Sequence, residues 1–212
     1  MTVNAGPGRR EQRLRKSDVT RGRILDAAAE VFRDKGYPGA RLSDIADLAD
    51  TQAGSLYYHF DSKEQLAEEV LAIGVDRVSA AVGAATEALP AGAPFADRLS
   101  AAVEAHVAGM LQNDAYSAAN VRIISQVPID VRERHLSRHR HYGAFWRDLL
   151  AAAQAAGEIR ADVDLPAMRM LILGALNWSV EWYRPGRLTP QEIARQFTEM
   201  LLRGILPQSK RF

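Results

Sequence analysis

Residues 42–60, LSDIADLADTQAGSLYYHF, are predicted to form two short helices joined by a tight turn. The first, from residue 43 to about residue 49, places Ile45, Ala46 and Ala49 on one apolar face. Ser43 stands at the N-cap position, where its hydroxyl accepts a backbone N–H. Asp50 follows at the turn, and aspartate tolerates the left-handed backbone that a sharp turn requires.

The second helix, from about residue 52 to residue 60, has two different faces. Leu56 and Phe60 lie four residues apart, so both can enter one core. The other face is polar and aromatic but almost uncharged, and consists of Gln52, Ser55, Tyr57, Tyr58 and His59. Small residues at its start allow close approach to a bulky partner. A helix-turn-helix that places its second helix in a DNA major groove has these properties.

The composition indicates a globular protein with a real core. Of the 212 residues, 47% are hydrophobic and 25% are charged. The absence of cysteine excludes disulfides and thiolate metal sites. The first 23 residues contain no apolar signal-peptide core, and the apolar run of residues 170–180 is too short to span a bilayer. We therefore expect a cytoplasmic protein.

Positive charge is concentrated at the start of the chain. Residues 1–23 hold seven basic and two acidic residues, whereas acidic residues are in excess over the remaining chain. Residues 1–17 lack hydrophobic periodicity and are predicted to be a basic disordered arm. Such an arm suggests a polyanion partner, and the alternative is a solubilising tail.

Helical periodicity extends over the rest of the chain. Helices are expected at residues 18–35, 63–86, 95–111, 115–126, 129–156, 164–182 and 189–206. Glycine after Lys35 ends the first of these, and a capping box of Ser62 and Gln65 begins the second. The predicted fold is all-α. A three-helix DNA-binding domain (18–63) precedes a larger helical ligand-binding and dimerisation domain (64–207) and a short tail (208–212).

Residues 23–70 resemble the N-terminal domain of the TetR family of bacterial repressors. The matching positions are Ile24-Leu25-x-Ala27-Ala28-x-x-x-Phe32-x-x-x-Gly36-Tyr37, then Ser43-x-x-Ile45-Ala46-x-x-Ala49, then Gly54-Ser55-Leu56-Tyr57-x-His59-Phe60-x-Ser62-Lys63-x-x-Leu66. Two departures are visible: Asp50 replaces the glycine usual in the turn, and Gln52-Ala53 replaces Ser-Lys. These departures suggest an operator sequence peculiar to this chain.

The resemblance implies roles for individual residues at the DNA. Gln52, Ser55 and Tyr57 would face base edges in the major groove, where glutamine can pair with adenine and a tyrosine ring can pack on a thymine methyl. Five residues would contact phosphates: Arg41, Ser43, Tyr58, His59 and Lys63. The arm residues Arg13, Arg15 and Arg21 would follow the backbone or enter a minor groove. The alternatives are a core position for Tyr57 and a capping or core-edge position for His59.

The resemblance also implies a dimer and an effector. The last two helices, 164–182 and 189–206, would form the homodimer, so that the operator becomes a pseudo-palindrome. A small molecule bound among the middle helices would change the spacing of the two heads. The candidate lining residues are Val103, His106, Met110, Ile124, Tyr142, Phe145, Trp146, Leu149, Asn177 and Trp178. Asn177 is a polar residue within an apolar run, which usually means that it has a specific partner.

Residues 177–189, NWSVEWYRPGRLT, are similar to a TetR subgroup that controls fatty-acid or steroid catabolism and responds to acyl-CoA thioesters. That subgroup has basic residues where this chain has Leu173 and Glu181, and an aromatic residue where it has Asn177. The basic side chains would meet the CoA phosphates. This chain lacks those basic side chains, and Glu181 adds a negative charge that would oppose the phosphates. The resemblance of the segment makes an acyl-CoA the first ligand hypothesis, and the alternative is a role of the segment in the dimer interface.

No catalytic motif, cofactor or metal site is predicted. His135, His139 and His141 lie close together, but the segment around them is strongly basic, which favours a solvated helix face over a cation site. The sequence thus predicts a ligand-responsive, DNA-binding transcriptional repressor that is not an enzyme. The alternative is a small-molecule-binding helical protein, or an enzyme, whose helix-turn-helix contacts protein rather than DNA.

Overall fold

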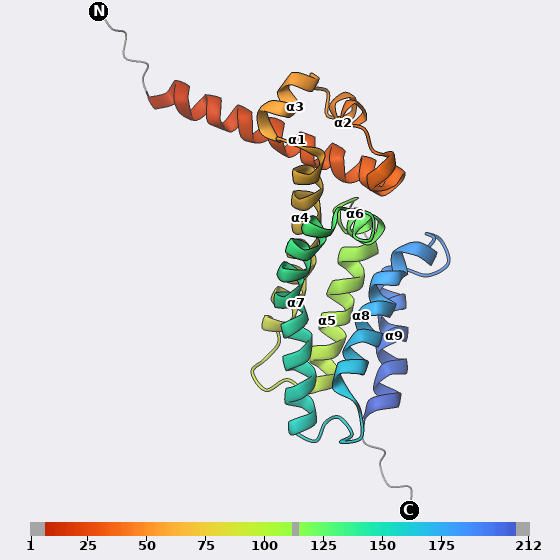
Figure 1. Cartoon of the computed structure of the whole chain (residues 1–212). Coiled ribbons are helices and arrows are strands. Elements are labelled where there is room, and N and C mark those ends of the chain that lie inside the picture. The colour runs from red at the N-terminus through yellow and green to blue at the C-terminus, as the bar shows by residue number, and fades with distance from the viewer. Residues whose placement is uncertain (1–6, 112–114, 207–212) are drawn as a thin grey trace, which may run out of the picture.

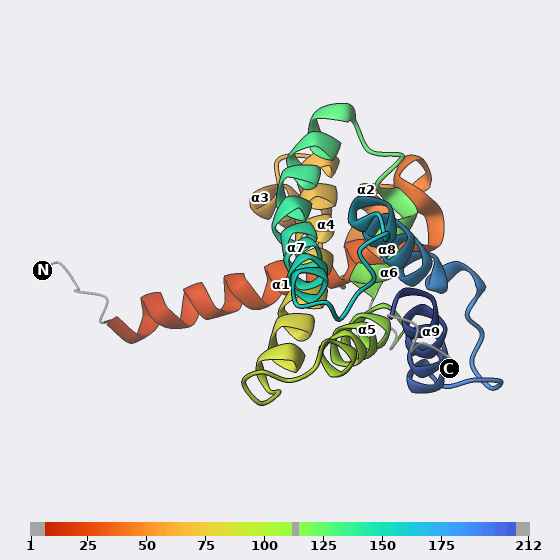
Figure 2. The ribbon, with the colours of Figure 1, turned by 90° about the horizontal axis from the view of Figure 1, so that it is seen from below.

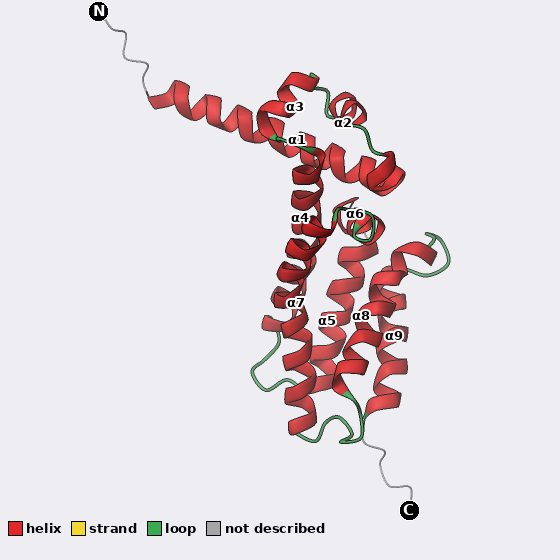
Figure 3. Ribbon diagram, viewed as in Figure 1, coloured by secondary structure: helices red, strands yellow, loops and turns green. Residues whose placement is uncertain are grey.

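The computed structural model describes residues 7–111 and 115–206, with side chains from residue 16 onward. Figure 3 shows helices and connecting loops, and none of the described residues belongs to a strand. The helices are α1 (Pro7–Gly39), α2 (Leu42–Leu48), α3 (Ala53–His59), α4 (Lys63–Glu87), α5 (Phe95–Leu111), α6 (Ala115–Ile123), α7 (Ile129–Ala155), α8 (Leu165–Trp182) and α9 (Pro190–Ile205). The predicted all-α fold is confirmed.

A small head of α1, α2 and α3 stands on the body formed by the later helices (Figure 1). Its core contains Phe32 of α1, Ile45 of α2, Leu56 of α3 and Phe60, each at most 1% exposed. Leu56 and Phe60 enter one core, as their spacing predicts. Burial of each of these four side chains contributes about 1.5–3 kcal/mol to the free energy of folding. Their shared core holds α3 against α1.

The predicted disorder of residues 7–17 is wrong, because α1 begins at Pro7 rather than near Asp18. Arginine, lysine, glutamine and glutamate are good helix formers, and α1 continues into a packed helix that supplies the nucleus. The first turns of α1 are thus helical although their sequence lacks hydrophobic periodicity. The first turns of α1 project away from the rest of the molecule in both views (Figures 1 and 2). Residues 1–6 of the predicted arm lie outside the described residues.

Two turns of the head are set by backbone geometry. Gly36 interrupts α1 with φ 69°, the left-handed conformation expected of a glycine after Lys35. Asp50 has φ 45° at the turn between α2 and α3, as predicted. The prediction that Ser43 is the N-cap is wrong, because Arg41 takes that position and its backbone N–H donates to Asp44 Oδ2 at 3.3 Å. The Asp44 carboxylate thus accepts a backbone N–H at the start of α2, where the Ser43 hydroxyl was expected to do so.

The helix α4 connects the head to the body. Ser62 caps it by accepting from the Gln65 backbone N–H at 3.1 Å, which confirms Ser62 as the predicted N-cap. Gln65 Oε1 accepts from the Asp61 backbone N–H at 2.7 Å, one residue before the N–H that the predicted capping box requires. Further along α4, a Cβ on Gly74 would lie 2.8 Å from the Tyr116 carbonyl oxygen of α6. Glycine is therefore required where α4 and α6 cross.

The hydrophobic core has two parts, and α6 belongs to the upper one. Tyr116, Ala119 and Ile123 of α6 are buried in the same cluster as the head residues of α1. A second cluster fills the body between α4, α5, α7, α8 and α9 and is centred on Trp146. The helix α6 thus lies between the head and the body (Figure 1). No helix among the described residues is long and apolar enough to cross a membrane.

Candidate DNA-binding surface and effector cavity

The outer face of α3 is exposed although its inner face is fully buried. Tyr57 is 58% exposed and Tyr58 is 74% exposed, so the alternative of a core position for Tyr57 is wrong. Gln52, at the N-cap of α3, is exposed and its side chain makes no capping bond. Ser55 is half-buried on the same helix. The surface formed by Gln52, Ser55, Tyr57 and Tyr58 is thus rigidly held and accessible.

The other predicted DNA contacts flank this surface. Arg41 and Ser43 are exposed at the start of α2, and His59 is half-buried at the end of α3. Lys63 Nζ donates to the Ala40 carbonyl oxygen at 2.9 Å and lies 4.4 Å from the centre of the Tyr37 ring. Lys63 thereby joins α4 to the loop before α2, while an ammonium group keeps further donors for a phosphate.

Two cations of the basic N-terminal segment are engaged inside the head. Arg21 pairs with Glu69 of α4, and its guanidinium lies over the Phe60 ring at 4.9 Å from the centroid. Arg23 donates to the carbonyl oxygens of Ala49 and Asp50, the latter at 2.8 Å. Arg21 and Arg23 therefore hold α1 against α4 and against the turn of the helix-turn-helix. The side chains of Arg13 and Arg15 lie outside the described residues.

A cavity of about 620 Å³ lies below the head and is lined by α4, α5, α6, α7 and α8. Its wall is mostly apolar, with Val75 and Val78 of α4, Met110 of α5 and Leu173 of α8. A cavity of this size and lining is typical of a small-molecule site.

A chain of hydrogen bonds crosses the inner wall of the cavity. His106, which is 1% exposed, lies between the Tyr142 hydroxyl, 2.6 Å from Nδ1, and Asn177 Oδ1, 3.1 Å from Nε2. In this arrangement Nε2–H donates to Asn177 and Nδ1 accepts from Tyr142. Burial lowers the pKa of His106 to about 4 and raises that of Tyr142 above its usual value, so both are neutral at pH 7. The predicted partner of Asn177 is thus His106.

Half of the predicted lining residues contact the cavity. His106, Met110, Ile124, Tyr142 and Asn177 line it. Four others do not, because Val103, Trp146 and Leu149 are buried in the core of the body and Phe145 packs half-buried against that core. Trp178 is 61% exposed on the outer face of α8. Helical periodicity identifies apolar faces but does not distinguish a core face from a cavity face.

The cavity is also lined by residues that are not among the predicted lining residues. Arg140 and Arg147 of α7 and Arg169 of α8 line it, together with Ser117 and Asn120 of α6. Charged residues spaced along amphipathic helices are usually solvated, so periodicity gave no signal for the arginines. Asn120 Nδ2 also donates to the Leu71 carbonyl oxygen at 2.8 Å, which ties α6 to α4 beside the cavity.

The helix α6 contacts the cavity and the head at once. Its residues Ser117 and Asn120 line the cavity, whereas the Tyr116 hydroxyl donates to Asp26 Oδ1 of α1 at 2.7 Å. Just after α6, Gln126 Oε1 accepts from the Tyr37 backbone N–H at 2.8 Å. A shift of α6 would therefore move α1.

An apolar surface remains uncovered on the last two helices. Leu171, Trp178 and Trp182 of α8 and Met200 of α9 are each at least 51% exposed, whereas Met170, which is also exposed, lines the cavity. These four residues are called the α8–α9 surface below, and exposed large apolar side chains of this kind can mark a protein interaction site. Other apolar residues of the same helices, such as Ile172 and Ile205, are instead buried within the chain.

No cluster of three or more metal-ligating side chains occurs among the described residues, which include the histidines of α7. His135 is 2% exposed, and neither of its ring nitrogens has a hydrogen-bond partner. Burial and the nearby His139 and Arg138 lower its pKa to about 4. His135 is thus a neutral, buried side chain rather than part of the solvated face that the sequence predicts.

Residues 24–70 match the family described as bacterial regulatory proteins, tetR family, and residues 92–205 match the tetracyclin repressor-like C-terminal domain. The second match covers more than half of the chain. The protein therefore belongs to the TetR family of helix-turn-helix DNA-binding regulators.

Individual relatives extend along almost the whole chain. The HTH-type transcriptional repressor KstR2 of Mycolicibacterium smegmatis is 32% identical over 190 residues, which cover 87% of this chain and 90% of that protein. The structure of the ketosteroid transcriptional regulator KstR2 of Mycobacterium tuberculosis has a TM-score of 0.77 at 28% identity, covering 89% of this chain and 95% of that one. AibR in complex with isovaleryl coenzyme A and operator DNA has a TM-score of 0.78 at 25% identity, covering 86% and 98%.

Proposed function

We propose that the protein is a dimeric transcriptional repressor that binds a pseudo-palindromic operator and is released by a small molecule. The observation that carries the proposal is the exposed, nearly uncharged polar and aromatic face of α3 on a head whose core is closed. A surface of this kind suits base edges in a major groove. The name of KstR2 as a repressor supports repression as the direction of control.

In this proposal Gln52, Ser55 and Tyr57 read base edges. The phosphate contacts come from Arg41, Ser43, Tyr58, His59 and Lys63, as the family resemblance implies. Their accessibility at both ends of the helix-turn-helix supports this assignment.

Dimerisation is proposed through the α8–α9 surface. A single helix-turn-helix reads too few base pairs for specificity, so a second copy is required. The exposed tryptophans Trp178 and Trp182 are of the type that dominates buried protein interfaces.

The effector is proposed to bind the cavity between α4 and α8, with an acyl-CoA or a related lipid-like metabolite as the first candidate. The volume and apolar lining support a lipid-like ligand. The complex of AibR with isovaleryl coenzyme A supports a thioester. The helix α6, which contacts both cavity and head, offers the route by which binding changes the head.

The test of operator binding uses a fluorescent duplex of the intergenic DNA upstream of the gene for this protein. Binding is expected to weaken steeply between 50 and 200 mM salt, by roughly 10³-fold or more, because several phosphates are neutralised. An absence of salt-sensitive binding to any region of the genome would contradict the proposal. Release of the duplex by acyl-CoA thioesters, but not by coenzyme A alone, is the expected effector result.

A further inference from the structure

The charges around the cavity are all of one sign. Among its lining residues three are arginines, namely Arg140, Arg147 and Arg169, and none is aspartate or glutamate. A mostly apolar cavity bordered by guanidinium groups attracts negative charge, because the low-dielectric wall strengthens the field of each cation.

Two of these arginines make no ion pair with any described residue. Arg140 Nη2 donates to Ser137 Oγ at 2.6 Å, and Arg169 Nη1 donates to the Gly143 carbonyl oxygen at 3.4 Å. Both partners are neutral, so the positive charges of Arg140 and Arg169 remain uncompensated. Arg147, in contrast, pairs with its neighbour Asp148 at 2.9 Å. Arg140 and Arg169 come from different helices, α7 and α8, and line the same cavity.

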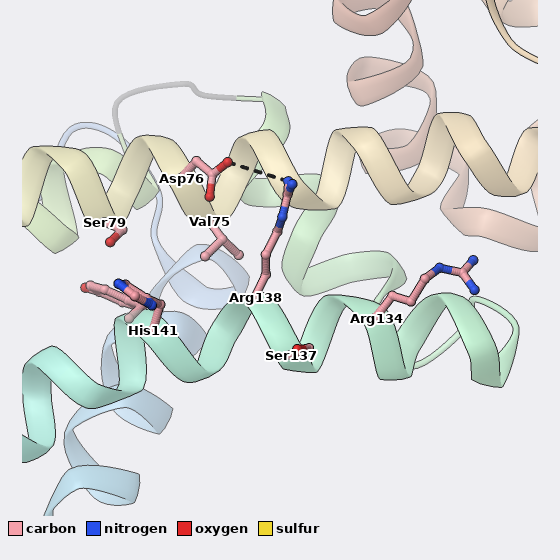
Figure 4. Close-up of a pocket in the computed structure, with 8 residues that line it drawn as sticks. Val75, Asp76, Ser79, Arg134, Ser137, Arg138 and His141 are labelled. Atoms are coloured by element: carbon pink, nitrogen blue, oxygen red, sulfur yellow. Dashed lines mark ion pairs between the residues drawn. The ribbon is translucent and has the colours of Figure 1, made fainter.

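A second groove, between α4 and α7, provides an internal comparison (Figure 4). It has a volume of about 560 Å³ and also contains two arginines. There Arg138 pairs with Asp76 at 3.7 Å, and Arg134 pairs with Glu68 at 2.9 Å. Its two arginines are thus already paired with carboxylates of the chain, whereas Arg140 and Arg169 are paired with none among the described residues.

The position of Glu181 removes one objection to an anionic ligand. Glu181 is exposed and is absent from the cavity lining, so its charge does not oppose an anion there. Leu173 and Asn177 do line the cavity, at positions that are basic and aromatic in the similar subgroup. Positive charge at the cavity comes instead from Arg169, one turn before Leu173 on α8, and from Arg140 on α7.

We propose that the effector is an amphiphilic anion whose apolar part fills the cavity and whose anionic group is bound by Arg140 and Arg169 together. The proposal rests on the proposed function of this cavity as the effector site. The bound group is a carboxylate or a phosphate, because guanidinium donors match both geometries.

The decisive experiment is isothermal titration of the full chain with ligands that differ only in their head group. The probes are dodecanoyl-CoA, dodecanoate and dodecanol, and the same three head groups on a steroid scaffold. At least one anionic probe is expected to bind at least tenfold more tightly than the alcohol of the same scaffold. Preference for the thioester identifies the CoA phosphates as the anion, and preference for the free acid identifies a carboxylate.

Substitutions then locate the anion. In the double variant Arg140→Gln and Arg169→Gln, anion binding is expected to weaken at least tenfold while binding of the alcohol is unchanged. The matched control Arg138→Gln removes an arginine of the same helix whose charge is already paired, and it is expected to leave both unchanged. Equal binding of anion and alcohol by the unmodified chain, equal losses in R138Q and the double variant, or no binding of any probe would overturn the proposal.

A third variant separates the cavity from the surface. A Cβ on Gly143, which lines the cavity on α7, would meet no atom within 4 Å, so Gly143→Leu is chosen to add a bulky side chain that reduces the cavity volume. It is expected to abolish binding of every probe, and undiminished binding would contradict the proposed site.

If the anion binds as proposed but does not release operator DNA, the proposed function fails while the arginine site stands. If the alcohol releases DNA as well as the anion does, the arginine site fails and the function stands.

Discussion

Single side chains of the head divide into those that hold it together and those that face outward. Arg21 and Arg23 belong to the basic N-terminal segment, yet both bind within the head. Tyr57 and Tyr58 do the reverse, because they are aromatic and exposed. Residue type alone therefore did not reveal which side chains remain free for DNA.

The substitution Tyr57→Ala is expected to weaken operator binding about tenfold, since a base contact contributes about 1–3 kcal/mol. The free energy of unfolding should change by less than about 0.5 kcal/mol, because the ring is largely exposed. Fluorescence anisotropy and urea denaturation measure the two quantities. Tyr57→Phe retains the ring and should retain most of the affinity if the ring packs on a thymine methyl. Unchanged binding by Tyr57→Ala would exclude a DNA contact of this residue.

His106 and His135 predict an acid sensitivity of the fold. Their folded pKa values are about 4, against an ordinary value of 6.5, so the unfolded chain binds more protons between pH 4 and 6.5. Stability is therefore fully present above pH 6.5 and falls as the pH decreases through this window, by at most about 1.4 kcal/mol per pH unit for each histidine.

The variant His135→Leu isolates one of these contributions. His135 has no hydrogen-bond partner to lose, so stability at pH 7 should be unchanged or higher. Its loss of stability between pH 7 and pH 5 should be smaller than that of the unmodified chain. Urea denaturation at several pH values measures both, and an unchanged pH dependence would show that His135 does not titrate on unfolding.

At the scale of elements, α6 joins the two parts of the molecule. It is buried in the core of the head through Tyr116 and Ile123 and also lines the cavity through Ser117 and Asn120. The boundary predicted from sequence after residue 63 assigned α6 to the body, whereas its packing is shared. In the proposed mechanism, this shared packing would transmit ligand binding in the cavity to α1.

Gly36, which interrupts α1, is expected to be intolerant of substitution. Gly36→Ala should destabilise the protein by about 1–2 kcal/mol, because φ is +69° and the new Cβ would lie 2.7 Å from Gln126 Oε1. Gly83→Ala is the control, since Gly83 lies inside α4 with open space at its Cβ, and it should stabilise by about 0.5–1 kcal/mol. Thermal denaturation compares the two. Equal effects would argue against a special backbone at Gly36.

The contact of α6 with α1 is expected to carry the effector signal. Tyr116→Phe removes the hydrogen bond to Asp26 but keeps the ring under Arg77. The ratio of the operator dissociation constants with and without effector should fall, by an amount equivalent to about 0.5–2 kcal/mol. The affinity for operator without effector and the affinity for effector without DNA should change little. Anisotropy titrations with the best probe measure the ratio. An unchanged ratio would place the coupling elsewhere.

At the scale of the whole molecule, the apolar α8–α9 surface predicts self-association. Trp178→Glu should convert a dimer into a monomer in sedimentation velocity and weaken operator binding, because a charge would be buried in the interface. Ile129→Glu alters a residue that is 67% exposed on α7 and should leave the dimer intact. A monomeric unmodified protein, or a dimer that survives Trp178→Glu, would contradict the proposed interface.

The sequence alone determined the helices, the head and the family. Helical periodicity, capping by Ser62 and the left-handed residues Gly36 and Asp50 are local properties, so they can be predicted from neighbouring residues. The exposed face of α3 could be predicted because Leu56 and Phe60 both lie on the opposite, buried face. The start of α1 was mispredicted because its first turns are helical without packing against a core.

Only the tertiary structure decided which apolar faces form core, cavity or uncovered surface. Trp146, Met110 and Trp178 look alike in a periodic pattern, yet they are buried, cavity-lining and exposed respectively. Arginines of α7 and α8 also look alike in the sequence, yet Arg138 forms an ion pair with Asp76 and, among the described residues, Arg169 bonds only a neutral carbonyl oxygen. These distinctions depend on which helices meet in space, and contacts between residues far apart in the chain are not encoded in local spacing.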